Sequence, residues 1–357
     1  MDDSRVLLAR LFLSVLLASA ALATPGLCGN AVTAVQPRQG GQRQSLDLTK
    51  TLAEYLKIQR EHPKKIKEKL GLDCNTLETQ NFIIHGSIDQ QLMKETSVLC
   101  EGLHSEFKRI FKYKKKEKLY AGKLELFLWQ DRGEFIKFAA GFDGYDATHA
   151  GGYFTSRGPL AHVNMYWDTR FTDKLAGKAR FFEVTIHELT HAHLRFYRSH
   201  NRIRVWVHEG FANLMAWYVI RRYGDRKIRD RVKTKDYFAN YLRRQAEQGK
   251  LRSMKDLMRQ RTMPGNDIEG YALAWIVAAN LVNMDNGMRF LKFVKAMKDE
   301  PAETARPTSQ ELLEKSFSYQ DWKFKECFGV TPQQFERWLL NWIVKNKSTF
   351  HKAFPFQ

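Results

Sequence analysis

The amino-acid sequence predicts an α+β protein, with a group of strands followed by a larger group of helices. The segments with strand-like apolar patterns all lie between residues 81 and 166. From residue 178 to residue 298, apolar residues recur almost throughout at helical spacing. Strands first and helices later are typical of an α+β domain, and the chain has no internal repeat.

The first half of this pattern predicts a small sheet. Strands are expected at residues 81–85, 124–129, 153–154 and 160–166, and helices between them at residues 90–111 and 131–140. The last two strands are separated by Ser156-Arg157-Gly158-Pro159, which is a turn sequence. We therefore predict that they form a hairpin.

The second half is expected to be helical. Residues 271–284 form a mostly apolar run, but 14 residues are too few to span a bilayer, so we predict a buried core helix. Beyond a polar linker at residues 301–307, residues 332–345 form a last helix rich in aromatic residues. We expect Trp322, Trp338 and Trp342 to pack this C-terminal helix onto the protein.

The N-terminus has the features of a secretory signal peptide. Arg5 and Arg10 supply a basic start, residues 11–20 are apolar, and Ala21-Leu22-Ala23 is a small-residue cleavage site. A transmembrane anchor is the competing interpretation, but the apolar run stops short of the roughly 20 residues that span a bilayer. We predict cleavage after Ala23 and a secreted or periplasmic protein without a transmembrane anchor.

Four regions follow from these patterns. Residues 1–23 are the signal peptide. Residues 24–75 are an extension that begins with a disordered Gly/Gln/Arg-rich stretch and continues as a helical pattern interrupted at Pro63. Residues 76–298 form the main domain, and residues 299–357 form a linker and C-terminal helices that pack on it. The sequence leaves open whether residues 24–75 are a removable pro-segment.

The chain is strongly basic, with 58 Lys and Arg against 39 Asp and Glu and a net charge of +19. The predicted signal peptide carries two basic and two acidic residues, so the mature chain keeps 56 minus 37, again +19. Such a charge indicates attraction to anionic partners. Basic clusters occur at residues 108–118 and 221–235, but no nucleic-acid-binding module accompanies them. We expect a cationic face attracted to an anionic envelope surface, and no specific nucleic-acid partner.

All four cysteines, Cys28, Cys74, Cys100 and Cys327, follow the predicted cleavage site. Their spacing contains no Cys-x-x-Cys pair, which disfavours a structural zinc cluster. Export permits disulfides, and we expect a bridge from Cys74 to Cys100. Four buried free thiols are the equally weighted alternative.

The candidate chemistry is concentrated in residues 181–191. His187 and His191 stand four residues apart with Glu188 between them, in a segment without Gly or Pro. On a helix, residues four apart lie one above the other, so both imidazoles can reach one metal ion while Glu188 faces it. A separate apolar stripe predicts that the same helix is buried against a core: Phe182, Ile186, Leu189, His193 and Phe196.

A catalytic zinc ion needs a third protein ligand and one open position. The extension His-x-x-Gly-x-x-His is absent, because Leu194 and Tyr197 occupy the positions of its glycine and last histidine. Glu209, which seventeen residues separate from His191, is the natural third ligand.

Glu209 lies at the start of a second predicted helix. Gly210 and Ala212 are expected to let this helix approach the first closely, and Asn213 to hydrogen-bond a ligand imidazole. The buried side of the helix is predicted to hold Phe211, Leu214, Met215 and Tyr218.

His187-Glu188-Leu189-Thr190-His191 followed by Trp206-Val207-His208-Glu209-Gly210-Phe211-Ala212 resembles the gluzincin zinc metallopeptidases, and among them the peptidase MA-like group of exported bacterial proteins. The similarity covers residues 76–298. It implies a zincin-like fold, in which a mixed sheet packs on the active-site helix and a mainly helical subdomain closes the cleft. It also implies one Zn²⁺ per chain, with His187, His191 and Glu209 as ligands and Glu188 as general base.

These parts predict hydrolysis of a peptide or protein substrate. Zn²⁺ activates a water molecule and polarises the scissile carbonyl, and Glu188 passes the water proton to the leaving amine. Related gluzincins supply an oxyanion donor from a later helix, and Tyr271 is our candidate, with a core tyrosine as the alternative. We expect residues 160–166 to be the sheet edge to which an extended peptide adds, with an ordinary edge strand as the alternative.

The remaining histidines have structural interpretations. His208 is expected beside the site or exposed, because the neighbour of a ligand points about 100° away on a helix. His193 is expected in the core, and His149, His162 and His200 have no partner at metal-binding spacing. The competing functional hypothesis is an exported binding protein that holds envelope polyanions on its cationic surface.

Overall fold

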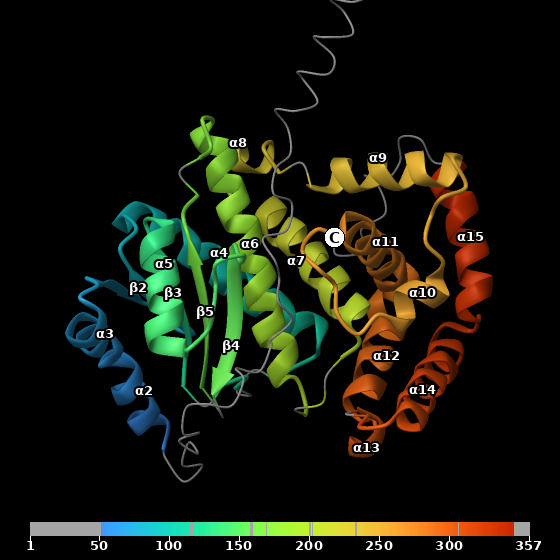
Figure 1. Cartoon of the computed structure of the whole chain (residues 1–357), viewed down its shortest axis with the longest axis horizontal. Coiled ribbons are helices and arrows are strands. Elements are labelled where there is room, and N and C mark those ends of the chain that lie inside the picture. The colour runs from blue at the N-terminus through green and yellow to red at the C-terminus, as the bar shows by residue number, and fades with distance from the viewer. Residues whose placement is uncertain are drawn as a thin grey trace, which may run out of the picture.

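Figure 1 shows the computed structural model, in which residues 51–114, 118–120, 122–157, 160–168, 170–199, 201, 203–232, 234–305 and 307–345 are described. The predicted signal peptide, the Gly/Gln/Arg-rich stretch, Cys28 and His200 lie outside these residues. A sheet with helices on both faces lies beside a group of helices, so the predicted α+β class is confirmed. Among the helices described, none is both long and apolar enough to cross a membrane.

Within the described residues, five strands form one mixed sheet in the order β1-β2-β3-β5-β4. Its edges are β1 (Asn75–Glu78) and β4 (Gly152–Arg157), and the parallel strands between them are β2 (Phe82–Gly86), β3 (Leu124–Trp129) and β5 (Leu160–Tyr166). β4 pairs antiparallel with β5, so the predicted hairpin is confirmed. The prediction that residues 160–166 are a sheet edge is wrong, because β4 is the outer strand of that hairpin and covers β5.

The two faces of the sheet carry separate cores. α4 (Gln90–Ile110) and α6 (Lys174–Phe196) cover one face, and α2 (Leu52–Arg60), α3 (His62–Leu70) and α5 (Arg132–Phe138) lie on the other. Neighbouring residues of a strand point to opposite faces. Leu126 accordingly packs with Ile186 of α6, whereas Phe127 packs with Ile66 of α3 and Phe135 of α5.

The N-terminal helices are bound to the sheet through a buried carboxylate. Gln59 donates from Nε2 to the carbonyl of Lys123 at 2.6 Å and to Oε2 of Glu125 at 3.2 Å. His62 Nδ1 lies 2.7 Å and His85 Nε2 lies 3.4 Å from Oε1 of Glu125. Burial opposes ionisation of this carboxyl, but the two imidazoles outweigh burial and lower the pKa of Glu125 to about 2. The described part of the N-terminal extension therefore packs on the face opposite α6.

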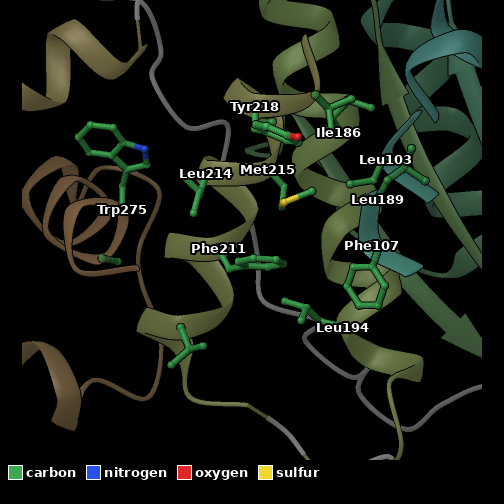
Figure 2. Close-up of a cluster of buried hydrophobic side chains, with 14 of the residues drawn as sticks. Leu103, Phe107, Ile186, Leu189, Leu194, Phe211, Leu214, Met215, Tyr218 and Trp275 are labelled. Carbon is green, nitrogen blue, oxygen red and sulfur yellow. The ribbon is translucent and has the colours of Figure 1, made fainter. Parts of the chain in front are cut away.

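α7 (Val205–Tyr223) is the centre of the second half and packs between α6 and α11 (Ile268–Asn283). Figure 2 shows Phe211 and Met215 of α7 on the side that faces α4 and α6. The four side chains predicted to be buried on this helix are buried, and so is the predicted core helix α11. The other elements are η1 (Ala139–Asp143), α8 (Arg226–Arg229), α9 (Thr234–Glu247), α10 (Met254–Arg259), η2 (Met284–Gly287), α12 (Met288–Lys298), α13 (Ala302–Ala305), α14 (Gln310–Phe328) and α15 (Pro332–Lys345).

Gly210 has a different neighbour from the one predicted. A Cβ atom on this residue would lie 2.1 Å from the carbonyl oxygen of Ala274 and 3.0 Å from Cβ of Ala278. The missing side chain therefore allows α11, and not α6, to approach the main chain of α7.

The predicted disulfide is wrong, because Cys74 and Cys100 are free thiols. Cys100 lies in the core between the sheet and α4, and Cys74 packs against the core on the opposite face. The sheet therefore separates the two sulfur atoms. Cys327 is also free and buried.

Two of the three C-terminal tryptophans do not pack as predicted. Trp322 is 57% exposed and Trp338 is 45% exposed. α15 is held instead by its aliphatic and phenylalanine side chains, because Phe335, Leu339 and Ile343 lie on the buried face of the helix.

Candidate metal centre

α6 and α7 bring together the three predicted metal ligands. The Nε2 atoms of His187 and His191 lie 3.0 Å apart. Oε2 of Glu209 lies 3.2 Å from Nε2 of His187 and 3.4 Å from Nε2 of His191. All three side chains are buried, and the group can hold a metal ion.

The local sequence explains how α6 presents both imidazoles. Asp173 caps the helix by accepting hydrogen bonds from the amides of Leu175 and Ala176. The helix then runs unbroken to Phe196, so His187 and His191 lie one turn apart on the same face.

The spacing and chemistry of the three ligand atoms fit a zinc ion. Tetrahedral Zn²⁺ with bonds of about 2.0–2.1 Å places its ligand atoms about 3.3 Å from one another. Both carboxylate oxygens of Glu209 are buried, and neither accepts a hydrogen bond from the described residues. Burial opposes ionisation of Glu209, but the His191 and His187 imidazoles outweigh it and hold its pKa below the usual range. A buried carboxylate without hydrogen bonds is costly unless a cation compensates it.

Asn213 orients one of the candidate ligands. Its Oδ1 accepts a hydrogen bond from Nδ1 of His187 at 3.0 Å, as predicted. With the proton on Nδ1, the lone pair of Nε2 faces His191 and Glu209.

His208 lies against the other imidazole ligand. Its ring stacks on that of His191, with centroids 4.1 Å apart and planes 3° from parallel. The prediction that this residue lies beside the site is confirmed. Burial and the neighbouring His191 lower the pKa of His208 well below its usual value, so the stacked ring is neutral.

Glu188 is buried beside the ligands and contacts the edge of the sheet. The main-chain amide of Phe154 in β4 hydrogen-bonds its carboxylate. Burial raises the pKa of Glu188 to about 7, because the effect of burial and of Glu209 exceeds the opposing effects of His187 and the Phe154 amide. This carboxyl can therefore both accept and release a proton near neutral pH.

Sequence reasoning missed the contribution of β4. A Cβ atom on Gly152 would lie 3.2 Å from Cγ1 of Val184 and 3.1 Å from Cβ of Met165. Glycine at this position lets the strand lie close to α6, which brings the amide of Phe154 to Glu188. The pair Gly151-Gly152 before a strand was the available signal.

Tyr145 is a second residue that the sequence did not reveal. Its ring packs on that of Tyr153 in β4, with centroids 4.7 Å apart. Burial raises the pKa of Tyr145, and the nearby carboxylate of Glu188 adds to the shift. It lies in the loop before β4, where no periodic pattern marks individual residues.

Tyr271 lies in the core of α11. It is fully buried, and its hydroxyl donates a hydrogen bond to the carbonyl of Met263 at 3.3 Å. These contacts agree with the alternative of a core tyrosine, and its catalytic role stays a prediction.

Of the other histidines, His193 lies in the core as predicted, and His149 and His162 lie outside the group of candidate ligands. His193 is buried, and its Nδ1 donates to the carbonyl of Leu189 at 2.7 Å. His162 lies on the sheet face opposite α6, with its Nε2 2.8 Å from Oδ2 of Asp143. His149 is exposed.

Comparison of the chain with protein-family models finds none that matches. Comparison with curated proteins finds no similar sequence either. The resemblance to gluzincins therefore rests on the two motifs and on the geometry that they adopt.

Proposed function

We propose that this protein is a zinc-dependent metallopeptidase of the gluzincin type, with a zincin-like fold. The observation that carries the proposal is the buried group of His187, His191 and Glu209, whose ligand atoms lie 3.0–3.4 Å apart. Glu188 lies next to this group and beside the edge of the sheet. Two imidazoles, one carboxylate and a neighbouring general base are the parts of a catalytic zinc site.

The residues of this chain supply the proton chemistry. A bound Zn²⁺ ion would lower the pKa of water towards about 7 and polarise a carbonyl group. Glu188, whose pKa is about 7, accepts the proton of the attacking water and delivers it to the leaving amine. Asn213 keeps Nε2 of His187 free to bind the metal.

β4, and not β5, is the strand that we propose for substrate binding. The Phe154 amide points to Glu188, away from β5. In an antiparallel ladder the direction of main-chain groups alternates, so those of Gly152 and Ser156 point the same way as those of Phe154. An extended peptide can add to these groups by main-chain hydrogen bonds beside the metal ligands.

The proposal also needs a donor that stabilises the oxyanion. Tyr271 remains the candidate, but its hydroxyl must leave the carbonyl of Met263 before it can act. We also propose that the protein is exported after cleavage at Ala23. The basic mature chain is then attracted to an anionic envelope surface.

Proteomic cleavage profiling of the purified chain with zinc tests the proposed function. The wild type should cut peptides, a chelator should stop the cutting, and E188Q should keep its zinc but lose turnover. E247Q is the matched control, because it makes the same change at an exposed position on α9 and should cut like the wild type. Hydrolysis by E188Q at the wild-type rate would overturn the proposal. So would a zinc-loaded wild type that cuts nothing, or that only binds polyanions in a salt-dependent way.

A further inference from the structure

The two helices that carry the candidate ligands are joined by a short connecting loop, of which residues 197–199, 201, 203 and 204 are described. It has to place Glu209 of α7 within 3.4 Å of His191 of α6. Arg198 in this loop has a φ of 60°, a left-handed conformation that is strained for a non-glycine residue. The loop therefore needs external contacts to hold its shape.

The ammonium group of Lys298 lies at the centre of these contacts. Its Nζ donates to the carbonyls of Ser199 and Asn201 at 2.9 Å each and to that of Arg195 at 3.2 Å. The residue is only 2% exposed, and burial together with the nearby Arg195 lowers the pKa of Lys298 to about 7. In its ammonium form, its three donors meet three carbonyl acceptors out of water. Arg195 belongs to the last turn of α6, where the helix dipole also favours a cation.

The loop returns hydrogen bonds to the chain around Lys298. Ser199 donates from Oγ to the carbonyl of Lys298 at 2.5 Å. Asn201 donates from Nδ2 to the carbonyls of Lys298 and Glu300 at 3.1 and 2.7 Å. Arg198 forms an ion pair with Asp299 at 3.2 Å. Residues 298–300 therefore act as one clamp on the loop.

The same clamp fixes the start of α7. Arg204, the N-cap residue of α7, bonds to Oε1 of Glu300 at 2.9 Å and to Oγ of Ser316 in α14 at 2.7 Å. Glu209 follows five residues later in a continuous helix, at a rise of about 1.5 Å per residue. A shift of the clamped end therefore moves the carboxylate together with the first turns of the helix.

We infer that Lys298 is a positioning residue for the metal centre, which sets the distance between Glu209 and the two histidines by clamping the connecting loop. The inference rests on the proposed zinc function. It also extends the functional unit beyond residue 298, because Asp299, Glu300 and Ser316 belong to the C-terminal region. Lys298 does not contact the metal ligands in this account; it acts by hydrogen-bonding the main chain that connects their two helices.

Titration with cobalt(II) tests this inference without any need for hydrolysis. The affinity for cobalt, and the visible absorption spectrum of the cobalt-loaded protein, report directly on ligand geometry. K298M should bind cobalt about 10–100-fold more weakly, the effect typical of removing an outer contact of a metal ligand, with an altered spectrum. K295M, one turn earlier on the exposed face of α12, is the control and should match the wild type.

A purely structural role for Lys298 predicts a different result. K298M would then unfold at a lower denaturant concentration, but the folded protein would keep the wild-type affinity and spectrum, and this result would overturn the inference. If K298M does not fold, N201A gives the answer, because it removes two hydrogen bonds of the clamp without removing a charge. It should weaken cobalt binding about tenfold, and unchanged binding would overturn the inference. A wild type that binds cobalt but cuts no peptide overturns the proposed function alone.

Discussion

Substitution of Gly210 by alanine tests how the packing of α7 on α11 holds Glu209 in place. The new Cβ would lie 2.1 Å from the carbonyl oxygen of Ala274, whereas Cβ contacts below 3.0 Å essentially never occur. The clash is with main chain and cannot be relieved by a rotamer change, so α7 and α11 must separate locally by about 0.9 Å. Glu209 is the preceding residue and moves with the helix.

The magnitude follows from two opposing terms. Overpacking costs about 1–3 kcal/mol, and replacing glycine by alanine within a helix returns about 1 kcal/mol. G210A should therefore lose up to about 2 kcal/mol of unfolding free energy. The helix displacement of about 0.9 Å is a substantial fraction of the 3.2 and 3.4 Å that separate Glu209 from the two histidines. We therefore expect zinc binding to weaken about tenfold or more, which is about 1.4 kcal/mol.

Urea denaturation and a competition titration with zinc measure the two effects. G133A is the control, because Gly133 is an exposed glycine in α5 whose added Cβ would meet only a side-chain oxygen of Asp131 at 3.1 Å. It should be unchanged or stabilised by up to about 1 kcal/mol, with wild-type zinc affinity. If G210A equals the wild type in both stability and zinc affinity, the argument from close packing is refuted.

Three further predictions concern separate parts of the molecule. N213A removes the hydrogen bond to Nδ1 of His187 and should weaken zinc binding about 10–100-fold in a competition titration, while unchanged affinity would show that His187 is oriented by other contacts. The lowered pKa of Glu125 stabilises the folded protein by up to about 3 kcal/mol above pH 4.5, and this stability is lost as the pH falls towards 2. The free energy of unfolding in urea should therefore change less between pH 6 and pH 3 for E125Q than for the wild type, and an equal change in both proteins would contradict this prediction. Alkylation of the denatured, unreduced chain should label both Cys74 and Cys100, and a disulfide-linked peptide containing the pair would contradict the structure.

The elements that could be predicted from the sequence are those with continuous apolar patterns. β3 and α15 begin and end where predicted, since each combines a dense apolar run with clear flanking residues. β1 was missed, because Leu77 is the only apolar residue in Asn75–Glu78. The edge strand was misassigned, because a hairpin pattern does not tell which of its two strands pairs with the rest of the sheet.

The candidate metal ligands were predictable for a similar reason. The spacing of His187 and His191 is a local property of one helix, and Glu209 follows in a recognisable second motif. The contacts that orient this group are not local: Lys298 lies 97 to 103 residues away from the carbonyls that it binds. A sequence pattern also does not show which neighbouring helix packs against a glycine. For this reason we predicted that Gly210 packs against α6, whereas it packs against α11.

The amount of zinc bound per chain is the most direct test of the central claim that His187, His191 and Glu209 form a zinc site. Native mass spectrometry of the zinc-reconstituted protein should show one ion per wild-type chain. The same measurement should show no bound ion for H191A, while the control H149A, changed at an exposed histidine, should keep one. Zinc bound in equal amount by H191A and the wild type would contradict the account.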